Sequence, residues 1–116
     1  MKKFLAIYTG TEAALARKKW NELDEKKRQE LEDAGMKAWM EWGKRNAAAI
    51  VDQGAPLGKT KRASSEGIAN IKNYMTGYVI VQAESHEAAA KLFEKHAHFT
   101  IFPGESVEIM ECLPLP

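Results

Sequence analysis

Apolar and polar positions alternate most clearly over residues 77–83, which stand between a mixed segment and the polar pair Glu84 and Ser85. Successive side chains on a strand point to opposite faces, which here gives two sets: Val79, Val81 and Ala83, and Tyr78, Ile80 and Gln82. Neither set has the polar character of a solvent-exposed face. The segment therefore predicts a strand in the middle of a sheet, with a cover on both faces.

Similar patterns predict three further strands, with helical periods between them. The strands are residues 3–8, 48–53 and 106–113, and the helices are residues 11–19, 25–44 and 86–97. Thr11, Asp24 and Ser85 stand where a side-chain oxygen can cap each helix. The long helix carries an apolar stripe that includes Trp39. Gly35 within it costs about 1 kcal/mol relative to alanine, which indicates close packing against a neighbour.

Residues 54–73 have no clear period. They begin with turn-forming residues, and Ile68, Ile71 and Tyr74 fit either one helical turn or an irregular strand. A connection this long inside a compact domain is typical of a functional loop or of a disordered segment.

The order of elements is β-α-β-β-α-β when the two early helices count as one unit. This is the ferredoxin-like split β-α-β pattern, an α+β fold whose four-stranded antiparallel sheet has its helices on one face. We expect a single such domain over residues 1–116. The more aliphatic face is assigned to the helices, and its residues are Leu5, Ile7, Val79, Val81, Val107 and Ile109.

The other face of this sheet mixes apolar and polar side chains. Its residues are Phe4, Ala6, Tyr8, Tyr78, Ile80, Gln82, Glu108, Met110 and Cys112. Left bare, it would be an unusually apolar surface. A second copy of the chain that covers this face would give a homodimer of the dimeric α/β-barrel kind.

Composition narrows the classes of protein. With 116 residues, one cysteine and a net charge of +1, the chain fits a single soluble domain in a reducing, cytoplasmic compartment. The charge gives no case for nucleic acid or for a membrane surface as a partner, and no apolar stretch approaches the roughly 20 residues of a membrane span. The short apolar run after Met1 lacks the cleavage site of a signal peptide, so we expect a first strand there.

Three stretches resemble the YCII-related and DGPF-type families of dimeric α/β-barrel proteins. Residues 54–61 are similar to the Gly-Pro-Phe-x-Glu-Thr-Lys stretch of the DGPF group, and residues 77–81 to its central Gly-Tyr strand. Residues 96–109 are similar to its His-Pro segment, which leads into a Val-Glu-Val strand. The departures are an inserted Ala55, Leu57 in place of Phe, Lys59 in place of Glu, and Ala97 in place of Pro.

This resemblance implies a homodimeric barrel with a pocket, which acts either as an enzyme or as a regulatory accessory protein. In the YCII group a histidine near the first long helix and a partner aspartate are suggested as catalytic. This chain has no histidine before His86, so that pair does not carry over.

His96 and His98 are candidates for chemistry because imidazole exchanges protons near neutral pH and binds transition metals. On a helix, residues two apart point about 200° apart and cannot hold one ion, whereas in an extended segment they can face the same way. No carboxylate or cysteine lies nearby at ligand spacing, so no metal site is predicted. His96 continues an apolar stripe, as a core histidine would, and His98 is the better candidate for a cleft.

Glu108 is a candidate general base, because a carboxylate desolvated inside a barrel accepts protons more readily. The alternative is a solvated residue at the edge of the sheet. Tyr8, Tyr78 and Gln82 share its predicted face, where they can orient a ligand or pack in the dimer interface.

Lys59 and Lys61 belong to a basic run that can clamp an anionic group or simply remain solvated. Cys112 has no cation near it in the sequence and fits structural packing. Trp39 and Trp42 can cage a planar ligand, although tryptophans on the apolar stripe of a helix are typical of core. No Walker or Rossmann glycine pattern is present, and no cofactor is predicted.

Two functions remain open, because no motif determines a reaction. The first is a small-ligand-binding dimeric barrel, acting as a cofactor-independent enzyme on a small organic molecule or organic anion, with its site between the sheet and the partner. Its candidate residues are His98 and Glu108 for catalysis, and Tyr8, Tyr78, Gln82, Lys59, Lys61 and His96 for ligand binding. The second is a non-catalytic accessory protein that acts through its dimer surface. A pocket with convergent titratable groups favours the first, and a filled interior favours the second.

Overall fold

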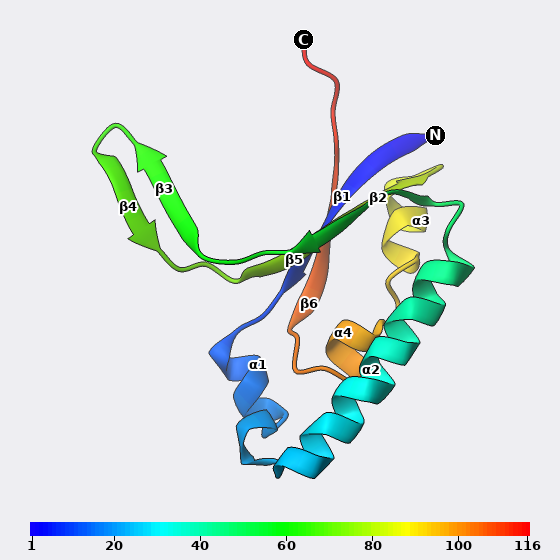
Figure 1. Ribbon diagram of the computed structural model, residues 1–116. Coiled ribbons are helices and arrows are strands. Elements are labelled where there is room, and N and C mark those ends of the chain that lie inside the picture. The colour runs from blue at the N-terminus through cyan, green and yellow to red at the C-terminus, as the bar shows by residue number, and fades with distance from the viewer.

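The computed structural model describes residues 1–116 and contains a four-stranded antiparallel sheet with helices on one side (Figure 1). Across the sheet the strands are β2 (Ile50–Pro56), β5 (Met75–Ala83), β1 (Lys2–Thr9) and β6 (Ser106–Glu111). β5 and β1 occupy the middle, and β1 pairs with both β5 and β6. The predicted ferredoxin-like α+β topology is therefore confirmed.

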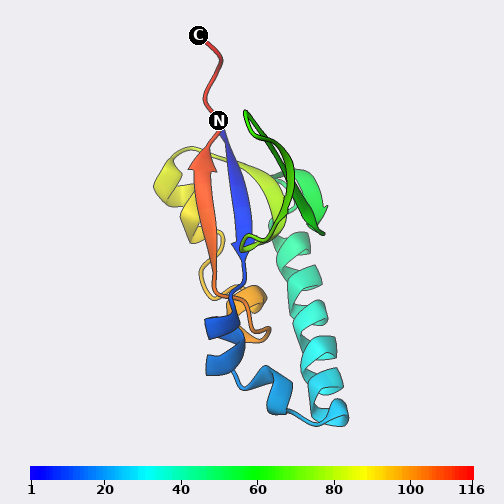
Figure 2. The ribbon, with the colours of Figure 1, turned by 90° about the vertical axis from the view of Figure 1, so that its left-hand side faces the viewer.

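The helices are α1 (Glu12–Arg17), the short 3-10 helix η1 (Trp20–Glu22), α2 (Glu25–Arg45), α3 (His86–Lys91) and α4 (Ala97–Thr100). Side chains of Thr11, Asp24 and Ser85 each accept a backbone N–H at the start of α1, α2 and α3, so the three predicted caps are confirmed. Figure 2 looks onto the side of the sheet that α2, α3 and α4 leave uncovered. None of the helices combines the length and the apolar character needed to cross a membrane.

The helices cover the face of β1 opposite to the one that the sequence predicted. Leu5 and Ile7 were expected under the helices, and this prediction is wrong. Phe4 pairs with Val81 and Ala6 with Val79, and directly opposite residues share a face of the sheet. Phe4 and Tyr8 therefore fill the core under the helices. Alternation predicts which residues share a face, but it does not say which face a helix covers. The uncovered face consists of Leu5, Ile7, Tyr78, Ile80, Gln82, Glu108 and Met110.

The helix predicted over residues 86–97 is interrupted, and that prediction is wrong in its second half. α3 ends at Lys91, and Lys95 adopts the left-handed backbone with φ 57°. His96 then caps α4, since its imidazole Nδ1 accepts the His98 backbone N–H at 3.0 Å. A local side-chain bond of this kind competes with continuation of the helix, although the apolar period runs on through the turn.

Residues 54–73 are ordered strands rather than an irregular loop. After β2, the strands β3 (Thr60–Ser64) and β4 (Gly67–Ile71) pair with each other as a separate hairpin. Ile68 and Ile71 lie in β4, so for them the strand alternative is confirmed. In Figure 1 the hairpin stands away from the four-stranded sheet.

The long helix α2 packs closely on the segment that follows α4. Gly35 is buried, and a Cβ atom there would lie 2.5 Å from the Phe102 ring. About two turns further along α2, the Trp42 indole donates a hydrogen bond to the Leu92 carbonyl at 2.6 Å. The close packing predicted at Gly35 is confirmed, and it positions α2 beside a cleft.

Candidate functional site

A cleft of about 770 Å³ lies between α2 and the sheet, bordered by β2 and the beginning of β5. Most of its lining is apolar, and its size suits a small organic molecule. One stripe of α2 forms a wall, with residues three or four positions apart: Met36, Trp39, Met40, Gly43, Lys44 and Ala47.

Tyr8 and His98 form the polar end of this cleft. Their side chains are 5% and 8% exposed, and their ring centroids are 5.2 Å apart. The Tyr8 hydroxyl has no hydrogen-bond partner within the chain, yet it is not sealed from solvent, and its residue lines the cleft. Burial raises the pKa of Tyr8 above its ordinary value. The phenol therefore stays protonated and can donate a hydrogen bond to a ligand.

The backbone of β1 determines which nitrogen of His98 carries its proton. Nε2 lies 2.7 Å from the Thr9 carbonyl oxygen, which can only accept a hydrogen bond, so Nε2 donates. In the neutral ring Nδ1 then holds a lone pair. Burial lowers the pKa of His98, and the bond to Thr9 opposes this only in part. His98 is therefore a neutral proton acceptor at the cleft.

Gly104 makes room for the His98 ring. Its backbone N–H donates to the His98 carbonyl at 2.9 Å, and a Cβ atom at this position would overlap both the imidazole and that carbonyl. Only glycine allows this close approach. The turn before β6 thus holds His98 against β1.

His96 lies behind His98 and does not line the cleft. It is 2% exposed, and its Nδ1 accepts a backbone hydrogen bond, which leaves the ring proton on Nε2. Nε2 has no hydrogen-bond partner, and the ring packs edge-on against Trp39, with centroids 4.5 Å apart. Burial, and then the nearby His98, lower the pKa of His96 to about 4. His96 therefore has the core position that the sequence left open as the alternative.

Of the other predicted site residues, only Tyr78 borders the cleft, and its side chain lies on the opposite, uncovered face of the sheet from Tyr8. Glu108 is exposed on the uncovered face, as is the amide of Gln82, which donates to the Ala48 carbonyl at 3.1 Å. The sheet therefore separates Glu108 from Tyr8, because β1 presents its other face. The grouping of Tyr8 with Glu108 on one face was wrong.

Lys59 and Lys61 belong to the β3–β4 hairpin region and do not line the cleft. Lys61 Nζ donates to the Asn70 side-chain oxygen at 2.8 Å across the hairpin. Lys44 is instead the basic residue at the cleft, and no sequence pattern distinguishes it from the other lysines of α2. Thr9 and Phe102 were also missed, because neither belongs to a recognisable motif.

Trp39 and Trp42 have different positions, although they are one turn apart on α2. Trp39 is half-buried and lines the cleft beside Tyr8, with ring centroids 4.7 Å apart. Trp42 also borders the cleft but is buried in the core with its indole N–H satisfied. The spacing of apolar residues on α2 is consistent with these two positions, since the stripe is wide enough to face both the core and the cleft.

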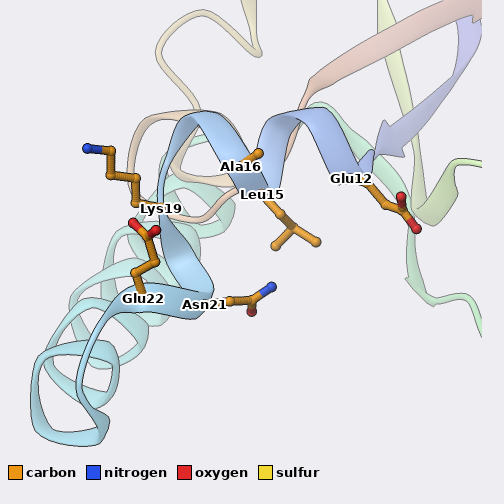
Figure 3. Close-up of a pocket in the computed structure, with 6 residues that line it drawn as sticks. All are labelled: Glu12, Leu15, Ala16, Lys19, Asn21 and Glu22. Atoms are coloured by element: carbon orange, nitrogen blue, oxygen red, sulfur yellow. The ribbon is translucent and has the colours of Figure 1, made fainter.

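A second hollow, of about 520 Å³, lies along α1 and η1 (Figure 3). In Figure 3 Lys19 and Glu22 extend to one side of this segment, and Leu15 and Asn21 to the other. None of its lining residues is buried. No group of three or more His, Cys, Asp or Glu side chains has a geometry that could hold a metal ion. The cleft beside α2 is therefore the candidate site.

The strand order and the one-sided helices define an α+β domain of the ferredoxin-like class. Among solved structures, the chain is similar to 5-chloro-2-hydroxyhydroquinone dehydrochlorinase (TftG) from Burkholderia phenoliruptrix, in complex with 2,5-dihydroxybenzoquinone. The TM-score is 0.52 at 14% sequence identity, over 92% of this chain and 89% of that chain. At this identity the likeness shows the fold alone. No family model matches the chain, and no curated protein sequence matches it.

Proposed function

We propose that this protein binds a small organic molecule in the cleft beside α2 and acts on it as a cofactor-independent acid–base enzyme. The observation that carries this proposal is the pair formed by Tyr8 and His98. Both are buried, both reach the cleft, and each has one polar atom that no group of the chain occupies. Such convergence of perturbed titratable groups in an apolar cleft is typical of active sites.

The chemistry follows from the two protonation states. His98 Nδ1 accepts a proton from a weakly acidic C–H or O–H group of the bound molecule and becomes an imidazolium, which the Thr9 carbonyl stabilises through Nε2–H. The Tyr8 hydroxyl donates a hydrogen bond to the oxygen on which negative charge develops. Return of the same proton to another atom of the molecule completes an isomerisation. In an elimination the electron pair of the broken C–H bond forms a double bond, the leaving group departs with the electrons of its own bond, and the imidazolium gives it the proton. Every step uses groups of this chain.

A variant that fills the cleft tests the binding site. A side chain at Gly43 would meet no atom within 4 Å, so Gly43→Leu should place a leucine in the cleft without disturbing α2. Gly58→Leu is the matched control, since Gly58 is equally open but lies outside the cleft. In ligand-observed NMR with a library of small organic compounds, we expect hits on wild type and Gly58→Leu, and loss of those hits on Gly43→Leu. Hits that persist on Gly43→Leu contradict the proposed site.

A second measurement separates catalysis from binding. For hits with an acidic C–H group, we expect the wild-type protein to accelerate exchange of that hydrogen with deuterated water. His98→Gln should slow this exchange by at least about 100-fold, the usual contribution of a general base, when both proteins are saturated with the compound. Equal exchange rates in both proteins would leave a binding protein without acid–base catalysis.

The similar structure offers only general support. Its name describes a dehydrochlorinase that acts on a chlorinated hydroxyhydroquinone, and it holds a small cyclic molecule. The proposal for this chain depends on its own cleft.

We also infer a homodimer, formed through the uncovered face of the sheet. Half-buried Leu5, Tyr78 and Ile80 and the exposed Met110 lie side by side there. The resemblance of residues 54–61 and 77–81 to the YCII-related and DGPF-type families agrees with this inference. The same apolar face is the observation that favours the second candidate, a non-catalytic accessory protein in the cytoplasm that acts through its dimer surface.

A further inference from the structure

We propose that the molecule bound in this cleft is a planar aromatic anion. Its ring would lie between α2 and the sheet, a hydroxyl group on it would reach Tyr8 and His98, and a carboxylate or similar acidic group would reach Lys44. This inference rests on the proposed function, because it names the class of molecule for the same cleft.

The charge of the lining is the first reason. Among the 19 residues that line the cleft, Lys44 is the only one with a formal charge at neutral pH, and no aspartate or glutamate is present. Lys44 makes no ion pair, since the one ion pair of the chain joins Arg17 to Glu105. Lys44 is solvent-exposed at the edge of the cleft, where an unpaired cation attracts an anion and disfavours a cationic ligand.

The shape and chemistry of the walls are the second reason. At the polar end the rings of Tyr8, Trp39 and Phe102 lie close together, with Trp39 and Phe102 centroids 6.1 Å apart. Further along, Gly43 on α2 and Gly77 on β5 present no side chains to the cleft. Aromatic rings at one end and backbone without side chains beyond them give an apolar lining against which an aromatic ring can stack. Flexible methionines at positions 36 and 40 border this space.

The spacing of the two polar ends is the third reason. Trp39 is beside His98, with ring centroids 5.9 Å apart, and Lys44 follows five positions later on α2. Five residues of helix rise about 7.5 Å and turn by about 140°, so Trp39 and Lys44 stand at opposite edges of the α2 stripe, and a molecule with a polar group at each end can span that stripe. The hydroxyl would donate to His98 Nδ1 and accept from Tyr8, and the acidic group would pair with the Lys44 ammonium.

Lys44 also stands in the last turn of α2, where any cation is stabilised by the helix dipole. Arg45 also stands in the last turn of α2 but does not line the cleft, so it is the matched control. A role limited to the helix dipole would be shared by both residues.

The test measures dissociation constants at low ionic strength, by isothermal titration calorimetry, for 4-hydroxybenzoate and for its uncharged analogue 4-hydroxybenzamide. We expect wild type and Arg45→Gln to bind the carboxylate at least about 10-fold more tightly than the amide. Lys44→Gln should reduce this preference to about 2-fold or less without weakening the amide. Tyr8→Phe should weaken both compounds about 5-fold or more and leave the charge preference intact.

The outcomes separate the two proposals. Equal binding of the two compounds to wild type, a preference that survives in Lys44→Gln, or no binding of either compound overturns the anionic class of ligand. The proposed cleft then still stands if other library hits are lost on Gly43→Leu. If 4-hydroxybenzoate binds Gly43→Leu as tightly as it binds wild type, the compound binds elsewhere and both proposals fail.

Discussion

Gly35 and Gly43 lie on the same helix but have opposite surroundings. A Cβ atom at Gly35 would be 2.5 Å from the Phe102 ring, whereas one at Gly43 would meet nothing within 4 Å. Alanine gains about 1 kcal/mol of helix propensity over glycine, but overpacking costs roughly 1–3 kcal/mol. We expect Gly35→Ala to lower the free energy of unfolding and Gly43→Ala to raise it by about 0.5–1 kcal/mol, as measured by urea denaturation.

A rescue variant checks the cause of the Gly35 effect. Combining Gly35→Ala with Phe102→Leu removes the aromatic ring that the new methyl group would meet. The two changes should be non-additive, with the double variant more stable than the sum of the single effects predicts. Additive effects would show that Phe102 does not limit residue 35.

His96 couples the stability of the fold to pH. Its pKa is lowered to about 4 by burial and by His98, against 6.5 for an ordinary histidine. Between these values the unfolded chain binds more protons than the folded chain, so acid favours unfolding. We expect the free energy of unfolding to be constant just above neutral pH and to fall by on the order of 3 kcal/mol as the pH drops from about 6.5 to about 4. Urea denaturation at constant ionic strength measures this.

A histidine variant distinguishes this coupling from general acid denaturation. His96→Gln should be less stable at pH 7.5 but should show a smaller slope between pH 6.5 and 5, above the range in which most carboxylates titrate. A wild-type stability that does not change over this interval would contradict the burial of neutral His96.

The candidate site was partly predictable at this scale. His98 could be chosen because it follows the apolar stripe of a helix and is freer than His96 to face a cleft. Tyr8 was chosen through its predicted grouping with Glu108 on one face, which was wrong. The proton on Nε2 of His98 could not be predicted, because it depends on a carbonyl 89 positions earlier in the chain. Lys44 could not be distinguished from the other lysines of this charged helix, because its position beside an apolar cleft depends on the fold.

At the scale of elements, periodicity predicted the four strands of the sheet, α1 and α2 to within a few residues at most boundaries. Periodicity failed where one sequence pattern is compatible with two different structures. The alternation of β1 fits either face, and only the aromatic volume of Phe4 and Tyr8 against α2 and α3 decides between them. The apolar period of residues 92–96 fits a helix, but Lys95 and the His96 cap end that helix first.

The β3–β4 hairpin is an element with few ties to the rest of its own chain. It forms a separate two-stranded sheet, and Ile68 within it is 77% exposed. Replacing residues 60–71 by an Asn-Gly turn should therefore change the free energy of unfolding of the four-stranded sheet by less than about 1 kcal/mol. Urea denaturation of the shortened chain measures this. A much larger loss would mean that the hairpin supports the core.

An isolated two-stranded hairpin is at best marginally stable in water, which raises the question of what holds this one in place. Ile68→Ser gives a matched comparison, because it alters the most exposed apolar residue of the hairpin without shortening the chain. If the hairpin packs on nothing, Ile68→Ser should leave both stability and oligomeric state unchanged. A shift in oligomeric state would place the hairpin at an interface between copies.

For the whole molecule, the decisive feature is a sheet with helices on only one side. Leu5, Tyr78 and Ile80 face away from the helices and are only half-buried. A bare apolar face of this kind is unusual for a monomer. Packing against the same face of a second copy would bury it with closed two-fold symmetry.

Ile80→Glu tests this arrangement. At the centre of a self-complementary interface the substitution brings two carboxylates together and removes the apolar contact of both isoleucines, so the dissociation constant of the dimer should rise at least about 100-fold. Native mass spectrometry and sedimentation velocity at micromolar concentration should show a wild-type dimer and an Ile80→Glu monomer with an unchanged circular dichroism spectrum. Leu115→Glu, at a position 94% exposed in the C-terminal tail, should remain dimeric. A monomeric wild type would overturn the inferred dimer while leaving the cleft beside α2 intact, because every residue of that cleft comes from one chain.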